Sequence, residues 1–325
     1  MLRRFLAVFE PFVLSLVGTV LLASLLPARD SWVVLFDRAA DAGIVLLFFL
    51  HGARLSREAI VSGMKNWRLH LTVFGATYVL FPLLGLGLSA LPLLEGSLAT
   101  GLLFLTLLPS TVQSSIAFTA IARGNVAAAV CSASISNLIG IFLTPALVAL
   151  LMGAKGSGGV SFASIETILL QLLLPFALGH ALRRWIGGWV TRHKKLVTFV
   201  DRGSILLVVY TAFGAAVIAG LWHRVSGFDL AMLLLVCSVV LAAVLAATWA
   251  AGRVLGLARE DQIVLIFCGS KKSLVSGVPM AGVLFPPATV GLVILPLMLF
   301  HQIQLIACAL IARRFADGGT QAENA

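Results

Sequence analysis

Charged residues are scarce in this sequence. They make up 11% of its 325 residues, and only 13 are Asp or Glu, whereas 60% of the residues are hydrophobic. A soluble domain carries about a quarter of its residues as charges, because its surface must be hydrated. The composition therefore excludes a soluble globular fold and predicts an all-α polytopic membrane protein.

Residues for metal or catalytic chemistry are also few. The four cysteines lie in apolar runs without paired metal-ligand spacing, and no His-Glu-x-x-His motif occurs. No acidic pair on facing spans suggests a protease, so an intramembrane enzyme is only a remote alternative. The net charge of +10 is scattered between apolar segments, which excludes a nucleic-acid-binding face. We expect no cofactor and no resident metal.

Long apolar runs dominate the chain, and about ten of them reach the roughly 20 residues that a bilayer requires. They cover 5–26, 32–50, 69–91, 97–121, 126–152, 165–182, 205–221, 230–251, 262–284 and 288–311. Most of the 23 lysines and arginines fall in one set of alternate connections; the other set holds Arg29, Lys155 and Arg224. The positive-inside rule then predicts that both termini are cytoplasmic, with the bacterial inner membrane as the location.

Two adjacent lysines, Lys271 and Lys272, interrupt the ninth apolar run. A lysine at the centre of a spanning helix costs about 2.5–3.5 kcal/mol unless protein groups or water receive it. One alternative is a short loop between two spans, but the flanking apolar segments are each too short to cross alone. We therefore predict one span, broken at 269–273, whose irregular backbone is buried in protein or lines a polar cavity.

A second interruption, at 109–115, lies about half the chain before the first and begins at Pro109. Corresponding broken helices indicate an inverted repeat, and five spans per half would insert the two halves in opposite orientation. We predict a first repeat over 1–160, a second over 161–315 and a disordered tail at 316–325. Asp37, Arg38 and Asp41 are expected to form a structural ion cluster. Interfacial helices are expected near 55–64 and around Trp185 and Trp189.

The two interruptions carry a family resemblance. The run from Pro109 to Ser115, followed by 122–127 (Ala-Arg-Gly-Asn-Val-Ala), resembles a signature of the bile acid:sodium symporter family. The run 269–274 (Gly-Ser-Lys-Lys-Ser-Leu) and the run 48–52 (Phe-Phe-Leu-His-Gly) resemble its SBF-like branch. The resemblance implies core and panel domains, two crossing broken helices and transport of a small organic anion by alternating access.

The resemblance also implies site residues. Substrate-binding positions are Ser110, Thr111, Gln113, Lys272, Ser273, Asn137 and His301; positions equivalent to the ion sites are Thr77, Ser114, Ser115, Ser132, Ser134 and Lys271. The chain departs from the family's sodium-coupled pattern, with Phe267 at the glutamate position, Lys271 at the glutamine position and Lys272 at the substrate-facing asparagine position.

These departures weaken the case for Na⁺ coupling, because a fixed positive charge repels a bound cation by about 4 kcal/mol at 4 Å. We hypothesise that Lys271 replaces the second sodium and that H⁺ binding couples transport. Steroid-like, keto-acid and pantoate-like anions all suit a Ser/Thr/Lys cavity with apolar walls. The main alternative is a membrane sensor or regulator that binds a ligand on the same scaffold without carrying it.

Overall fold

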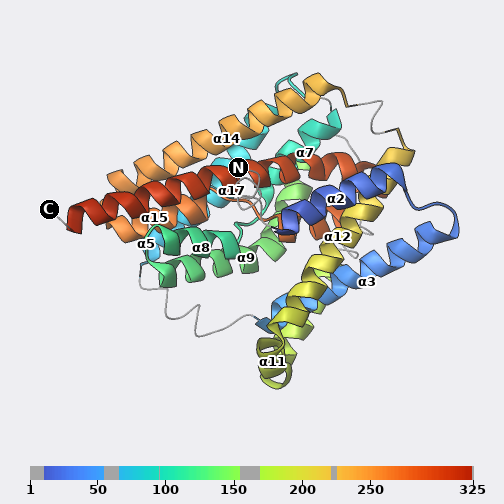
Figure 1. Cartoon of the computed structure of the whole chain (residues 1–325), viewed down its shortest axis with the longest axis horizontal. Helices are drawn as coiled ribbons and strands as arrows, with labels where there is room; N and C mark the ends of the chain where they lie inside the picture. Colours follow the sequence, from blue (N-terminus) through green and yellow to red (C-terminus); the bar gives the residue numbers. More distant parts are fainter. Residues whose placement is uncertain (1–10, 55–65, 95, 154–168, 221–224, 324–325) are drawn as a thin grey trace. The chain divides into compact units, whose positions relative to one another are not determined.

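A computed structural model describes residues 11–54, 66–94, 96–153, 169–220 and 225–323. Within these ranges the regular structure is entirely helical, as predicted (Figure 1). The α-helices are α2 (Pro11–Leu25), α3 (Ser31–Arg54), α5 (Trp67–Gly75), α6 (Phe81–Ser89), α7 (Gly96–Leu107), α8 (Gln113–Ile121), α9 (Val126–Gly153), α11 (Leu174–Arg192), α12 (Lys194–Ile218), α14 (Gly227–Val254), α15 (Arg259–Gly269), α16 (Leu274–Leu284) and α17 (Pro287–Glu323); η1 (Ala76–Leu80) and η2 (Leu169–Leu173) are short π-helical turns.

Six helical segments of the described chain are long and apolar enough to cross a membrane. They are Trp67–Ser89, Val126–Met152, Lys194–Ile218, Gly227–Val254, Arg259–Leu284 and Pro287–Asp317. The segment Arg259–Leu284, which contains the two lysines, is 94% buried inside the protein, whereas the others are 33–44% buried. The lysine-bearing segment is therefore enclosed by protein, which is the condition for irregular backbone at membrane depth.

The chain folds into two compact units that interleave along the sequence. Unit 1 comprises Met1–Leu55, Pro145–Ser226 and Gly277–Leu295, and unit 2 comprises Ser56–Thr144, Gly227–Ser276 and Pro296–Ala325. Each unit takes segments from both predicted repeats, so the units do not correspond to the two sequence halves. The repeat boundary at 160 stays a prediction.

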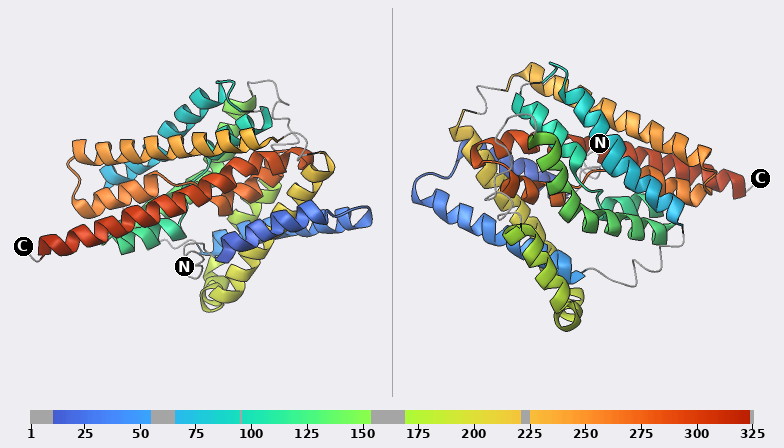
Figure 2. Two further views of the ribbon diagram at one scale, coloured as in Figure 1. Left: turned by 45° about the horizontal axis from the view of Figure 1, so that its top comes forward. Right: turned by 180° about the vertical axis from the view of Figure 1, so that it is seen from behind.

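Unit 1 is organised by a close crossing of α3 and α11, which lie against each other in both views of Figure 2. A Cβ atom added to Gly52 would lie 2.0 Å from the Phe176 carbonyl oxygen, and one added to Gly179 would lie 1.9 Å from the Phe49 carbonyl oxygen. Only glycine lets the two backbones approach this closely, as is common between membrane helices.

In unit 2, hydrogen bonds to Asp261 join the starts of α5, α9 and α15. Asn66, the N-cap of α5, donates to Asp261 Oδ2 at 2.6 Å, and Asn125, just before α9, donates to Asp261 Oδ1 at 2.9 Å. Asp261 itself lies in the first turn of α15, where a carboxylate is favoured by the helix dipole. A Cβ on Gly124 would lie 2.6 Å from Ile263 Cγ2, so the Arg-Gly-Asn turn needs its glycine to pack here.

The two segments expected to form interfacial helices have different outcomes. Trp185 and Trp189 lie in the last turns of α11, which continues without a break to Arg192 instead of forming a separate surface helix. The interfacial segment near 55–64 lies outside the described residues, as does most of the connection before α11.

Two further expectations differ from the structure. Asp37, Arg38 and Asp41 are exposed and form no ion pair within the described ranges. The tail predicted to be disordered from residue 316 continues α17 as far as Glu323. Polar composition alone does not separate an exposed helical end from coil, which explains the second difference.

Candidate functional site

The two interrupted segments meet inside unit 2. The chain leaves helical geometry between α7 and α8, at 108–112, and between α15 and α16, at 270–273, which confirms both predicted breaks. The Ser273 amide donates to the Pro109 carbonyl at 2.9 Å. Ser110 Oγ donates to the Cys268 carbonyl at 2.6 Å, and Ser115 Oγ donates to the Phe267 carbonyl at 3.0 Å. The first segment therefore satisfies backbone groups that the second break leaves free.

Lys272 occupies a cage of backbone carbonyls. Its Nζ donates to the carbonyl oxygens of Thr77 at 2.8 Å, Thr106 at 2.8 Å and Leu108 at 2.7 Å. The side chain is fully buried, and the ring of Phe81 lies 4.2 Å from Nζ. An ammonium group has three N–H donors, so this lysine has no donor left for a ligand. Its burial excludes the loop alternative.

The local backbone explains why these carbonyls are available. In the π-turn η1 the Phe81 amide donates to the Ala76 carbonyl, and Pro82 has no amide hydrogen, so the Thr77 carbonyl lacks both of its usual backbone donors. The Thr106 carbonyl would accept from Ser110 in a continuous helix, but the Ser110 amide donates to Ser136 Oγ at 3.0 Å. The Leu108 carbonyl loses its donor because the helix has ended.

Gln304 of α17 holds the backbone of Lys272 from the other side. Its Oε1 accepts from the Lys272 amide at 2.9 Å, and its Nε2 donates to the Lys272 carbonyl at 3.0 Å. His301 Nδ1 lies 2.9 Å from Gln304 Nε2, so the predicted site residue His301 orients this clamp. Gln304 is fully buried, and a single side chain thus replaces two backbone partners lost at the break.

Lys271 has the opposite environment. Its side chain is fully buried, yet Nζ has no hydrogen-bond partner within the described part of the chain. The ring centroids of Phe118 and Phe267 lie 4.0 Å and 5.4 Å from Nζ. Aromatic faces attract a cation but accept no conventional hydrogen bond, so three donors remain free.

The described part of unit 2 places no buried carboxylate with the two lysines. Among the described residues Asp201 is the one buried carboxylate, and it belongs to unit 1. A buried charge is stable only when it is paired or strongly solvated by polar groups. Lys272 is solvated by carbonyls, whereas Lys271 Nζ has no such partner among the described residues.

Helix α9 contributes the remaining polar groups of the site. Asn137 Nδ2 donates to the Ser110 carbonyl at 2.6 Å, and Asn137 Oδ1 accepts from Ser276 Oγ at 2.9 Å.

Ser273 Oγ accepts from the Ser276 amide at 3.1 Å and therefore caps the start of α16. Helix α8 has no such side-chain cap. Free amide groups at the start of α8 favour an anion.

The predicted residues fall into three groups. Ser110, Ser115, Asn137, Lys272, Ser273 and His301 join the network around the breaks, and Thr77 joins through its carbonyl while its hydroxyl bonds to Val73. Gln113 and Ser114 begin α8, and Thr111 lies in the break before it. Ser114 Oγ is buried without a partner within the described ranges. Ser132 pairs with His70 at 2.7 Å, away from the breaks, and Ser134 is half-buried on α9.

Ser136 and Ser276 were not predicted. Ser136 supplies Oγ to the Ser110 amide and its carbonyl to Tyr78 Oη at 2.6 Å. A signal for Ser136 exists in the sequence, because it lies directly beside Asn137 in a run rich in small hydroxyl residues. Ser276, three residues after Ser273, has the spacing of a capping pair.

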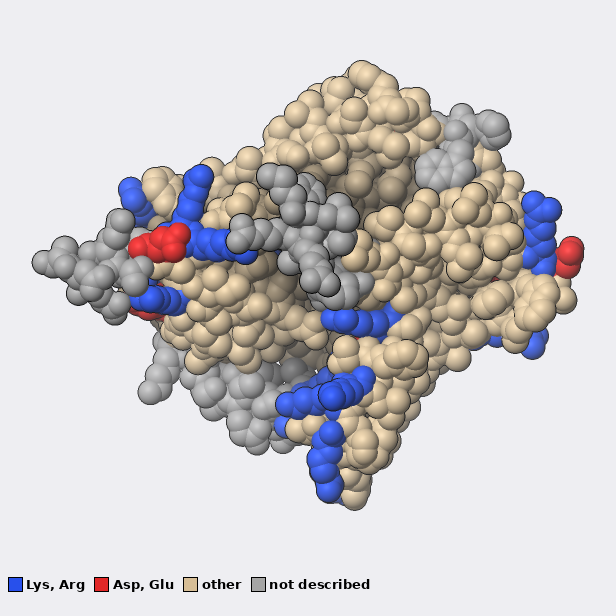
Figure 3. Space-filling view, viewed as in Figure 1, with Lys and Arg blue, Asp and Glu red and all other residues tan. Residues whose placement is uncertain are grey.

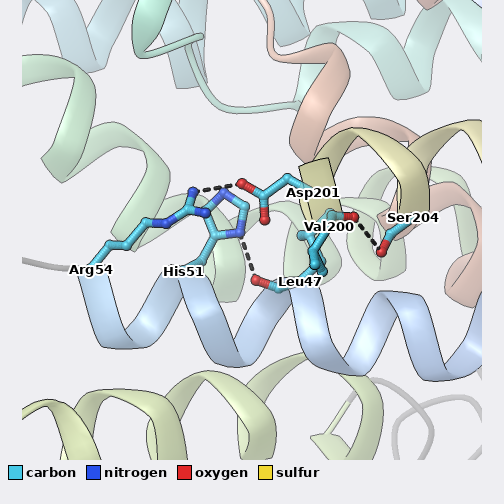
Figure 4. Close-up of polar contacts among 6 residues, drawn as sticks. All are labelled: Leu47, His51, Arg54, Val200, Asp201 and Ser204. Atoms are coloured by element: carbon cyan, nitrogen blue, oxygen red, sulfur yellow. Dashed lines mark hydrogen bonds and ion pairs between the residues drawn. The ribbon is translucent and has the colours of Figure 1, made fainter. Parts of the chain in front are cut away.

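Unit 1 contains its own polar cluster, which is partly exposed (Figure 4). Arg54 Nη1 lies 2.6 Å from Asp201 Oδ2, and the ring of His51 lies beside this pair, with Nδ1 2.8 Å from the Leu47 carbonyl. The side chains of Arg54 and Asp201 are 33% and 11% exposed. The pair joins α3 to α12.

A helical membrane protein with two interrupted segments that meet around buried charge has the architecture of a secondary transporter. The SBF-like CPA transporter family model matches residues 10–317, and the chain belongs to this family. Protein PA2026 of Pseudomonas aeruginosa is 58% identical over 94% of this chain and 93% of its own length. The Escherichia coli protein named "Putative symporter YfeH" is 53% identical over 95% and 93%. Rat sodium/bile acid cotransporter 7 is 28% identical over 81% and 78%.

Proposed function

We propose that this protein is a secondary active transporter that carries a small organic anion by alternating access. Its site is the meeting point of the two breaks in unit 2. The observation that supports it most is that Lys271 and Lys272 are fully buried with no buried carboxylate among the described residues of that unit. A substrate anion would supply the missing negative charge. Family membership supports transport as the activity.

The proposal includes the arrangement predicted from the sequence. Ten spans form two inverted repeats, the protein lies in the bacterial inner membrane, and both termini are cytoplasmic. The asymmetric distribution of Lys and Arg between alternate connections supports this orientation. The meeting of one break from each half supports the inverted repeat, because such repeats bring their broken helices together.

The geometry favours exchanging the roles that the resemblance suggested for the two lysines. Lys272 is surrounded by oxygens as a monovalent cation would be, so we assign it as the tethered replacement for a coupling cation. Lys271 has free donors, so we assign it as the contact for the substrate anion and the group that binds H⁺. A permanently attached cation at this place removes the need for Na⁺ there.

The substrate site extends along one face of α8. Ser114 and Phe118 are four residues apart and therefore lie on the same helix face, and Lys271 Nζ lies over Phe118. Ser114 Oγ and Lys271 Nζ are both buried without partners in the described chain. An anion here would receive donors from Lys271, Ser114 and the uncapped start of α8, with Thr111 and Gln113 at its edge.

Uptake into proteoliposomes tests this proposal. Purified protein would be reconstituted and supplied with labelled cholate, a short 2-keto acid or pantoate, under a Na⁺ gradient, a pH gradient or neither. We expect uptake of at least one anion under the pH gradient, no requirement for Na⁺, and loss of pH-driven uptake in Lys271→Gln. Binding of an anion without uptake under any gradient would instead identify a sensor.

A further inference from the structure

A second candidate site lies on the surface of unit 2. It is a groove of about 430 Å³ between α14, α15 and α17, which lie side by side in Figures 1 and 2. Its walls are Leu245, Ala246, Trp249, Ile266, Ile311 and Phe315, with Arg314 as the one charged residue among those that line it. An apolar groove with a single cation at one end fits an amphiphile.

The cation in this groove is available. Arg314 is exposed and has no hydrogen bond or ion pair within the described ranges. Arg259, nearby on α15, donates from Nη2 to the Phe315 carbonyl at 2.6 Å and so fixes the end of the groove. Arg253 stacks over the ring of Trp249 at 4.1 Å, which places a further positive charge at the rim.

The position of the groove relative to the bilayer indicates what kind of ligand it binds. The apolar part of α14 ends at Arg253, and that of α17 ends at Arg313 and Arg314, so one end of the groove reaches the membrane interface. Trp249 has the interfacial position that membrane tryptophans prefer. Figure 3 shows Lys and Arg side chains gathered near the C-terminal end of α17, with Asp and Glu among them.

We propose that this groove binds an anionic phospholipid, with an acyl chain along Leu245, Ala246, Ile266 and Ile311 and the phosphate on Arg314, assisted by Arg253. Basic pockets between membrane helices on the cytoplasmic side are typical binding sites for such headgroups. A soluble anion would leave the apolar walls unfilled, and a neutral lipid would leave Arg314 without a counter-charge. This inference does not depend on which solute is transported.

The groove is also linked to the site. Ile266, which lines it, directly precedes Phe267, whose ring lies 5.4 Å from Lys271 Nζ and whose carbonyl accepts from Ser115. A lipid that packs on Ile266 would hold α15 just before its break. We therefore expect bound anionic lipid to raise the thermal stability of unit 2.

Lipid binding to the purified full-length protein tests the proposal. Native mass spectrometry would measure phosphatidylglycerol and phosphatidylcholine adducts of the wild-type chain and of Arg314→Gln. A basic residue near a membrane surface contributes about 1 kcal/mol, so we expect phosphatidylglycerol to bind Arg314→Gln about fivefold more weakly. The matched control is Arg313→Gln. It removes the same charge from the neighbouring residue, whose side chain does not line the groove.

A second variant tests the apolar half of the site. Ala246→Phe would fill the groove while keeping every charge, and we expect it to reduce phosphatidylglycerol adducts as strongly as Arg314→Gln does. Equal losses in Arg313→Gln and Arg314→Gln, or unchanged binding in Ala246→Phe, would show general surface attraction and overturn the proposal. Equal thermal stabilisation by millimolar inorganic phosphate alone would also overturn it, because the ligand would then be a free anion.

Discussion

The two units hold basic side chains in different ways, because Arg54 of unit 1 is partly exposed and Lys271 and Lys272 of unit 2 are fully buried. In unit 1, Arg54 is paired with the carboxylate of Asp201 at 2.6 Å, so the cluster is close to neutral as the chain is built. In unit 2, Lys272 is held by three neutral carbonyls and Lys271 by aromatic rings, and neither lysine has a carboxylate partner in the described chain. The first arrangement carries its own counter-charge, although Asp201 Oδ1 is buried without a partner in the described chain, whereas the described part of unit 2 offers the two lysines no carboxylate. The paired arginine therefore fits a structural role, whereas the two unpaired lysines fit the proposed anion site.

Lys272→Met should have the largest effect on stability, because Lys272 donates three buried hydrogen bonds. Methionine cannot donate, so the carbonyls of Thr77, Thr106 and Leu108 would all lose their partner. An unsatisfied buried acceptor costs about 1–3 kcal/mol, and we expect a loss of about 3 kcal/mol or more. Thermal unfolding in one fixed detergent would measure it. A melting temperature equal to that of wild type would show that the cage does not hold the fold.

Lys271→Met makes the same substitution one residue away and should have the opposite profile. Lys271 Nζ has no hydrogen-bond partner in the described chain, so its loss leaves no protein group unsatisfied. We expect equal or higher thermal stability, because a buried unpaired charge is removed. Anion affinity should fall about tenfold to a hundredfold, as for the loss of a hydrogen bond to a charged group. Equilibrium binding of the transported anion measures this, and unchanged affinity would remove Lys271 from the substrate site.

Asp201→Asn tests the neutral cluster. The variant keeps the shape of the side chain but leaves Arg54 without its counter-charge. Because Arg54 is 33% exposed, water screens the pair, and we expect a stability loss of only about 1 kcal/mol. Uptake per folded molecule should not change. The double variant Arg54→Met with Asp201→Leu should recover most of the lost stability, and an uptake defect in it would assign this pair a role in transport.

The sequence was sufficient to predict the membrane class and both breaks. Pro109 and the adjacent lysines are local signals, since proline removes a backbone donor from a helix and charge is costly in a lipid-facing one. The role of each lysine could not be predicted, because it depends on which carbonyls are free. That depends on the π-turn before Pro82 and on Ser136, which lie far from Lys272 in the sequence. Likewise, nothing near Arg54 in the sequence points to Asp201.

Ser114→Ala should have the smallest effect, and Ser115→Ala is its matched control. Ser115 Oγ donates to the Phe267 carbonyl, so its removal leaves a buried acceptor unsatisfied and should cost about 1 kcal/mol of stability. Ser114 Oγ has no partner in the described chain, so the same change should leave stability unaltered. Because we propose that Ser114 donates to the bound anion, Ser114→Ala should weaken the apparent affinity of the protein for that anion about two- to tenfold. A fall in stability without a fall in affinity would place Ser114 in the structural network, and the substrate site would then lie away from this face of α8.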